Sequence, residues 1–256
     1  MRFIVNEEKK IIFGWSPKCG CTHIKNIVGF LENKNVFGVN SVMYNTCELP
    51  ENLNNYIIII IIRNPYKRII SGLLDKYKES GLFRHLWNID IPLTFENFID
   101  KIMESNYNII DYEHFSTQTS GWFIDEIKTH TKTIIYDIGN IDYEYIGSLY
   151  NKTIPPDIIQ FRGDHINNNT EPFNEYVFNK EIDEYSNYKI PIEYFYNDDL
   201  KEKMKKIYKK DFEFFESKGF YYSCKQTDDL IRDYSKSISK INTYNSSKYR
   251  NRRNMC

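Results

Sequence analysis

The sequence predicts a single α/β domain in which a central, mostly parallel β-sheet is flanked by helices. The first sign is Ile57–Ile62, an unbroken run of isoleucines. Such a run, without alternating polar residues, is typical of a parallel strand that helices cover on both faces. The second sign is the apolar run Ile11–Trp15, which is followed by apolar residues at helical spacing up to Leu31. With 256 residues, 41% of them apolar, the chain can bury a substantial core.

Composition narrows the class of protein. A formal net charge of −1 gives no reason to expect a nucleic-acid partner. Five cysteines without a C-x-x-C pair argue against a disulfide framework or a zinc site and favour a reducing compartment. Charged residues at positions 7–10 interrupt any signal-peptide core, and no apolar stretch is long enough to span a membrane. We therefore expect a soluble, intracellular protein, and the many Asn, Ile, Lys and Tyr residues suggest an AT-rich genome.

Further elements follow along the chain. Residues 33–50 look like a loop, with a short strand possible at Val36–Val39. Pro65 suits the first turn of a helix, which we expect to run to about Glu79. Later segments predict a helix over Thr94–Ser105, a strand over Lys132–Tyr136, a helix through Tyr143 and Leu149, a loop over Ile154–Thr170, and one long helix from Asp198 or Asp199 through Phe215.

The last predicted helix carries its own start and stop signals. Asp199 and Glu202 are spaced as a capping box at its start, and Gly219 is suited to end it. Beyond it the chain becomes rich in Ser, Asn and Lys, with eight basic and three acidic residues. We predict a folded domain over residues 1–224 and a flexible basic tail over 225–256, which keeps the protein soluble or, alternatively, binds an anionic partner.

The turn after the first apolar strand has the composition of an anion-binding loop, Pro17-Lys18-Cys19-Gly20-Cys21-Thr22. A strand that turns into a helix directs backbone N–H groups and the positive end of the helix dipole at one spot. Lys18 adds a charge, Gly20 lets the backbone approach an anion, and Thr22, the expected N-cap, adds a hydroxyl. The cysteines fit better as small residues of a tight turn than as reactive thiols. The pattern G-x-x-x-x-G-K-[ST] is absent, and an ordinary turn with a surface lysine is the alternative.

Other candidate residues stand where such a sheet would bind a ligand. In open α/β sheets, ligands bind beyond the carboxyl ends of the strands. Arg63 directly follows the isoleucine strand, so we expect it beside Lys18, and Ser71 lies two helical turns further on. Taken singly, Arg63 fits a structural ion pair and Ser71 a plain helix surface. Residues 111–118 gather acidic, imidazole and amide groups, and a later loop carries His165.

Two of these segments resemble motifs of one family, the sulfotransferases that use 3′-phosphoadenosine 5′-phosphosulfate (PAPS). The loop at 17–22, with Lys25, looks like the family's 5′-phosphosulfate loop. The segment Arg63-Asn64-Pro65, with Ser71 eight residues after the arginine, looks like its 3′-phosphate motif. The closest branch is that of the carbohydrate sulfotransferases that modify chondroitin and dermatan, and the resemblance covers roughly residues 10–222.

Three later segments follow in the family's order. Residues 111–118 resemble its D-x-H-x-x-x-Q segment, although Phe115 and Thr117 replace the usual tryptophan and proline. His165–Asn167 resembles an H-x-N segment, and Tyr208–Phe215 resembles the closing Y-x-x-D-F pattern. The resemblance implies a three-layer P-loop-like fold. The membrane anchor and luminal disulfides of Golgi members are not visible in this sequence.

The resemblance implies in-line transfer of a sulfuryl group from PAPS to an acceptor hydroxyl on a glycan, without a metal. It would place Lys18 beside the oxygen that bridges phosphate and sulfate. His114 is the first candidate for the general base, with Glu113 and His165 as alternatives. The donor-binding residues would be Lys18, Cys19, Gly20, Cys21, Thr22, Lys25, Arg63 and Ser71.

Two readings from other classes compete with this one. An ATP-dependent kinase would share the α/β scaffold and the anion loop, but the sequence shows no evident pair of magnesium-binding carboxylates. A degenerate, non-catalytic module would bind a nucleotide or glycan, and the altered segment around His114 leaves that open. Sulfation of a protein tyrosine or of a small molecule is a variant of the enzyme reading.

Overall fold

The fold is an α/β domain built on a four-stranded, mostly parallel sheet. The structure is a computed structural model that describes residues 1–34, 48–119, 123–160 and 175–225. Its strands are β1 (Arg2–Asn6), β2 (Ile11–Trp15), β3 (Ile57–Ile62) and β4 (Thr133–Asp137), in the spatial order β1-β2-β3-β4. The β2–β3 and β3–β4 pairs are parallel, as the sequence predicts, whereas β1 pairs antiparallel with β2. This antiparallel edge strand was not expected from the sequence.

Both faces of the sheet are covered, which explains the unbroken isoleucine run. Ile59 and Ile61 pack in a core that includes residues of the helices α1 (Cys21–Leu31), α6 (Tyr143–Leu149) and α7 (Pro156–Gln160). Ile58, Ile60 and Ile62 pack with residues of α5 (Phe123–Thr129) and α10 (Lys209–Ser217). Because each face meets helices, neither set of side chains needs to be polar. The predicted central parallel strand is confirmed.

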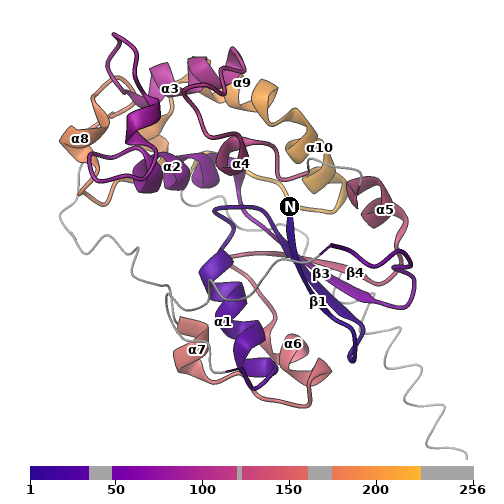
Figure 1. The fold of residues 1–256 in the computed structure, drawn as a ribbon. Helices are drawn as coiled ribbons and strands as arrows, with labels where there is room; N and C mark the ends of the chain where they lie inside the picture. The colour runs from indigo at the N-terminus through magenta and orange to yellow at the C-terminus, as the bar shows by residue number, and fades with distance from the viewer. Residues whose placement is uncertain (35–47, 120–122, 161–174, 226–256) are drawn as a thin grey trace, which may run out of the picture.

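The remaining helices form a second cluster beside the sheet (Figure 1). Its core is rich in aromatic rings, with Tyr77, Phe98 and Phe115 in mutual edge contacts. Gly72 lets the helix that carries it pack closely against Phe115, since a Cβ there would lie 2.6 Å from the Phe115 ring. The elements of the cluster are α2 (Pro65–Lys76), α3 (Phe95–Met103), α4 (Tyr112–Phe115), α8 (Ile182–Tyr185), α9 (Asp198–Ile207) and the 3₁₀ turns Arg84–Leu86 and Ile192–Phe195.

The predicted long C-terminal helix is wrong in one respect, because the chain forms two helices that meet at Tyr208. The Tyr208 hydroxyl donates to the Phe115 carbonyl at 2.7 Å, a tertiary contact that no helical periodicity encodes. The predicted capping box is also wrong, since Asn197 caps α9 by accepting from the Leu200 N–H. Gly219 follows α10 with a φ of 86°, as a C-terminal glycine should.

Most other predicted elements are present with shifted ends. The helix that begins at Pro65 stops at Lys76 instead of near Glu79, and the helix α5 was not expected from the sequence. The strand proposed at Val36–Val39 lies outside the described residues. So does nearly all of the predicted tail, and the division of the chain into domain and tail stays a prediction. In the part of the chain that the structure describes, no helix has the length and apolar character needed to cross a membrane.

Candidate functional site

The loop between β2 and α1 is held in an unusual backbone conformation. Lys18 has a φ of 69° and Gly20 a φ of 80°, both in the left-handed region. Gly20 is the N-cap of α1, so the prediction that Thr22 caps this helix is wrong. A Cβ at Gly20 would lie 2.3 Å from Ile138 Cδ1, so only glycine fits this turn. The left-handed turn at Gly20 brings the chain into the helix before Thr22 is reached.

The start of α1 is open to an anion. No side chain caps the helix, and its first turn contains no acidic residue. Lys25, one turn further on, is only 6% exposed and has no hydrogen-bond or ion-pair partner in the described part of the chain. A helix N-terminus without an acidic residue, followed one turn later by a buried lysine, is suited to bind a phosphate or sulfate group.

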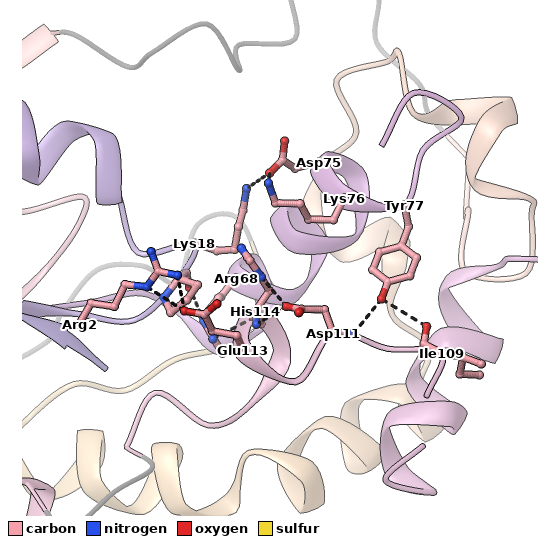
Figure 2. Close-up of polar contacts among 11 residues, drawn as sticks. Arg2, Lys18, Arg68, Asp75, Lys76, Tyr77, Ile109, Asp111, Glu113 and His114 are labelled. Atoms are coloured by element: carbon pink, nitrogen blue, oxygen red, sulfur yellow. Dashed lines mark hydrogen bonds and ion pairs between the residues drawn. The ribbon is translucent and has the colours of Figure 1, made fainter. Parts of the chain in front are cut away.

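Lys18 is paired with a carboxylate that sequence reasoning missed. Its Nζ lies 2.9 Å from Asp75 Oδ2, and Lys76 Nζ lies 3.0 Å from the same oxygen (Figure 2). Burial alone would raise the pKa of Asp75, but the two ammonium groups outweigh it and hold the pKa at about 2. Burial lowers the pKa of Lys18, and Asp75 counters that shift. An anion that enters the loop therefore has to compete with Asp75 for Lys18.

Arg63 reaches the same loop from the end of β3. Its Nη1 donates to the Lys18 carbonyl at 2.9 Å, which confirms that the two residues are neighbours. That carbonyl is the only hydrogen-bond acceptor of the Arg63 guanidinium among the described residues. Burial lowers the pKa of Arg63, and the opposing effect of the Asp137 carboxylate compensates only in part for the lost hydration. The guanidinium keeps most of its donors for a ligand.

A pocket of about 570 Å³ opens beside Arg63 and Ser71. The polar lining residues that the structure describes include two further cations, Lys67 and Lys189, and no carboxylate. The Ser71 hydroxyl makes no hydrogen bond within the described residues. The apolar part of the lining comes from α2 and from residues 190–195. A pocket with a cationic end and an apolar wall is suited to a ligand that carries both a phosphate and a ring.

Cys19 of the loop is not a reactive group. The Cys19 thiol is fully buried and donates to Gln118 Oε1 at 2.9 Å. Burial raises the pKa of this thiol to about 11, so the nucleophilic thiolate does not form near neutral pH. Cys19, Cys21 and Cys224 are all free thiols. For Cys19, the interpretation as a small structural residue is the better one.

The segment with the candidate bases folds into α4. His114 Nδ1 lies 2.5 Å from Asp111 Oδ1, and the same oxygen accepts the His114 backbone N–H at 2.9 Å. Because a carboxylate only accepts, Nδ1 carries the proton and Nε2 keeps a lone pair. Glu113 instead forms an ion pair with Arg2 (Figure 2). Because Glu113 is engaged with Arg2 and His114 is oriented by Asp111, the geometry of α4 favours His114 over Glu113. His165 lies outside the described residues.

A buried network joins the motifs to one another. Gln118, 1% exposed, donates to the Arg63 carbonyl at 2.8 Å and accepts from the Arg63 N–H at 3.0 Å and from Cys19. Asp211, fully buried, accepts the backbone N–H groups of Gln118 and Thr119, both at 2.8 Å. The Y-x-x-D-F pattern therefore supports the loop segment that orients Arg63. The order of the motifs in the sequence does not predict these contacts between them.

Comparisons with known proteins place the chain. A profile described as "Sulfotransferase family" matches residues 1–221. Searches against curated proteins and against solved structures gave no match. The matched region includes every motif described above and ends before the C-terminal residues 226–256.

Proposed function

The chain belongs to the sulfotransferase family, and from that premise we propose that it transfers a sulfuryl group from PAPS to an acceptor hydroxyl on a carbohydrate. The observation that best supports PAPS as the donor is the position of Arg63. It joins the Lys18 loop to the cationic pocket, so one ligand with two separate anionic groups can occupy both. PAPS is such a ligand, since it carries a 3′-phosphate as well as its 5′-phosphosulfate.

Each end of the donor has matching groups. The 5′-phosphosulfate belongs at the start of α1, with the backbone of Gly20, Cys21 and Thr22 around it and Lys25 nearby. The 3′-phosphate belongs with Arg63 and Ser71 in the pocket. The family's P-loop-like architecture, expected from the resemblance, agrees with this placement of phosphate at a strand-to-helix turn.

The chemistry then needs little more than positioning and charge stabilisation. The acceptor oxygen attacks sulfur while the bond from sulfur to the bridging oxygen breaks, and the 5′-phosphate leaves. Lys18, released from Asp75, stabilises the charge that develops on the leaving phosphate. His114 Nε2 takes the proton of the acceptor hydroxyl, and Asp111 stabilises the imidazolium that forms. The resemblance to chondroitin and dermatan sulfotransferases supports a glycan as the acceptor.

Donor recognition is tested by thermal stabilisation with 3′-phosphoadenosine 5′-phosphate, the product of PAPS, against adenosine 5′-phosphate and ATP. A ligand at one hundred times its dissociation constant stabilises the folded state by about 2.7 kcal/mol, a readable shift in Tm. We expect that, of the three compounds, only 3′-phosphoadenosine 5′-phosphate raises the Tm. Stabilisation by ATP alone would favour a kinase, and none by any of the three would favour a non-catalytic module. Transfer of label from [³⁵S]PAPS to desulfated chondroitin then tests the acceptor.

The Arg63→Ala variant should lose its preference for the 3′-phosphate. Two charge-assisted hydrogen bonds, together worth about 3 kcal/mol, correspond to roughly 100-fold weaker binding of 3′-phosphoadenosine 5′-phosphate. Binding of adenosine 5′-phosphate should change little. Titration calorimetry with both ligands measures the difference, and Arg84→Ala, which removes an arginine bonded to Asp183 instead, is the control. Equal losses for the two ligands would contradict the assignment.

The Asp75→Asn variant should bind the product more tightly. Without the carboxylate, Lys18 does not have to break an ion pair before it binds the ligand. One charge-assisted hydrogen bond of about 1.5 kcal/mol corresponds to a roughly tenfold lower Kd. The control is Asp100→Asn, which removes an aspartate that pairs with Lys203 on α9. Weaker binding by Asp75→Asn would mean that Asp75 holds Lys18 in its binding position and does not compete for it.

A further inference from the structure

Arg68 is a buried arginine that sequence reasoning did not single out. It lies in the first turn of α2 and is only 2% exposed. Its guanidinium donates to three backbone carbonyls: Nε to Pro17 at 2.9 Å, Nη1 to Ser116 at 2.7 Å and Nη2 to His114 at 3.0 Å. The first acceptor precedes Lys18 in the loop, and the other two belong to the segment of the candidate base. One rigid group therefore touches both halves of the site.

The partners of Arg68 are neutral, which is costly for a buried charge. All three groups that accept from its guanidinium are backbone carbonyls. Among the described residues, Arg68 forms no ion pair with a carboxylate. An apolar side chain of similar volume would fill the same space without that desolvation cost. What an apolar residue or a lysine lacks is a planar fork that holds three acceptors in a fixed arrangement. The residue therefore suits a task of geometry better than one of packing.

Other contacts of the site do not set the same distance. Gln118 joins Cys19 to the backbone of Arg63, and the Ser16 hydroxyl bonds the Gln118 carbonyl at 3.2 Å. These contacts tie the loop to a residue four positions beyond His114. Asp111 orients the imidazole, but only relative to its own helix.

We propose that Arg68 is a positioning residue that sets the distance between the Lys18 ammonium and the His114 imidazole (Figure 2). For its catalytic consequence the proposal rests on the proposed function. In the transfer step, Lys18 lies by the leaving oxygen while His114 takes the proton from the attacking one. The distance between the two side chains must therefore match the span from the attacking oxygen through sulfur to the leaving oxygen. Arg68 contacts neither the donor nor the acceptor and acts through the backbones that carry these two residues.

The test compares Arg68→Lys and Arg68→Met with the wild-type protein and with Arg84→Lys. Arg84 is a matched control, because it also donates to a backbone carbonyl, that of Tyr77 at 3.1 Å, away from the loop. A displacement of about 1 Å in a reacting group can cost roughly 100-fold in rate, so we expect kcat of Arg68→Lys to fall by about that factor. The KM for PAPS and the Kd of 3′-phosphoadenosine 5′-phosphate should stay within about threefold, since Arg63 and the pocket are unchanged. Arg84→Lys should keep the wild-type kcat.

A second readout separates positioning from plain stability. When 3′-phosphoadenosine 5′-phosphate binds at the loop of the wild-type protein, the ¹⁵N resonances of the His114 ring should shift, and the His114→Asn variant assigns them. In Arg68→Lys the ligand should still bind, but this response should disappear. If Arg68 only stabilised the fold, Tm would fall while the folded variant kept both the response and the wild-type kcat. That result, or an unchanged kcat at an unchanged Tm, would overturn the proposal.

The outcome can be told apart from a failure of the proposed function. If the wild-type protein neither binds 3′-phosphoadenosine 5′-phosphate nor transfers sulfate, the proposed function fails, and hydrogen exchange of the ligand-free protein decides on Arg68. Faster exchange in Arg68→Lys, confined to peptides that cover residues 16–20 and 114–116, supports the proposal. Exchange equal to that of Arg84→Lys overturns it. Should Arg68→Met fail to fold, the lysine variant still gives each of these readings.

Discussion

Replacing Lys18 with methionine should lower kcat about 1000-fold while the protein still binds the 3′-phosphorylated product. Removing one preorganised donor from a developing negative charge costs roughly 10²–10³ in rate in other enzymes. Lys18 is the cation of the loop, and once an anion displaces Asp75 its ammonium is free to stabilise the charge on the leaving phosphate. Methionine keeps most of the volume of the lysine side chain but not its charge. Transfer of label from [³⁵S]PAPS to desulfated chondroitin measures the loss.

Two comparisons sharpen the Lys18 experiment. The variant Lys76→Met removes the other ammonium of the Asp75 carboxylate and should leave kcat within about tenfold, because Lys76 is not part of the loop. The Kd of 3′-phosphoadenosine 5′-phosphate in Lys18→Met should rise far less than kcat falls, since Arg63 and Ser71 hold the other phosphate. A loss confined to binding, with kcat intact at saturating PAPS, would take Lys18 out of the chemical step.

The second large effect is expected at His114. A positioned general base contributes roughly 10²–10⁴ to the rate, so His114→Ala should reduce transfer to the limit of detection. The reason is that Asp111 occupies Nδ1, so Nε2 is the ring nitrogen left with a lone pair, and alanine offers no proton acceptor. Binding of PAPS and of its product should be unchanged, because α4 does not line the donor pocket. Radiolabel transfer and titration calorimetry together measure the two quantities.

The candidate bases are separated by parallel variants. Glu113→Gln removes the carboxylate that pairs with Arg2 and should retain at least about a tenth of the wild-type kcat, because that group is already engaged. His85→Asn removes an exposed histidine of a neighbouring turn and serves as the control for histidine loss. Full turnover by His114→Ala would exclude it as the base and direct attention to Glu113 or His165.

The architecture of the sheet could be predicted because its signal is local. The isoleucine run and the strand-to-helix turn at 11–31 can each be recognised from neighbouring residues in the chain. The two strands that they predict, β3 and β2, are present and parallel. The strand β1 escaped prediction because its apolar run, Phe3-Ile4-Val5, is only three residues long, shorter than the runs that indicate a strand. The break at Tyr208 escaped it because a hydrogen bond to Phe115, 93 residues away, interrupts a periodicity that continues on both sides.

The proximity of Arg63 to Lys18 was also predictable. Lys18, Arg63 and Ser71 stand at positions that strand order and motif spacing define, and the structure brings Arg63 to the Lys18 backbone. Asp75 was missed, although it follows Ser71 by one helical turn and so shares its face of α2. No sequence pattern reveals that its carboxylate meets Lys18, because that contact depends on how α2 packs against the loop.

By itself, the sequence determined the fold class, the order of the motifs and the residue types of the turn at 17–22, since these depend on neighbours in the chain. Only the tertiary structure decided how the motifs cooperate. It placed the buried Asp211 and Gln118 behind Arg63, and Arg68 between the loop and His114. The physical reason is that a buried polar group needs partners, and these partners come from segments up to about a hundred residues away. Burial turns separate motifs into one site.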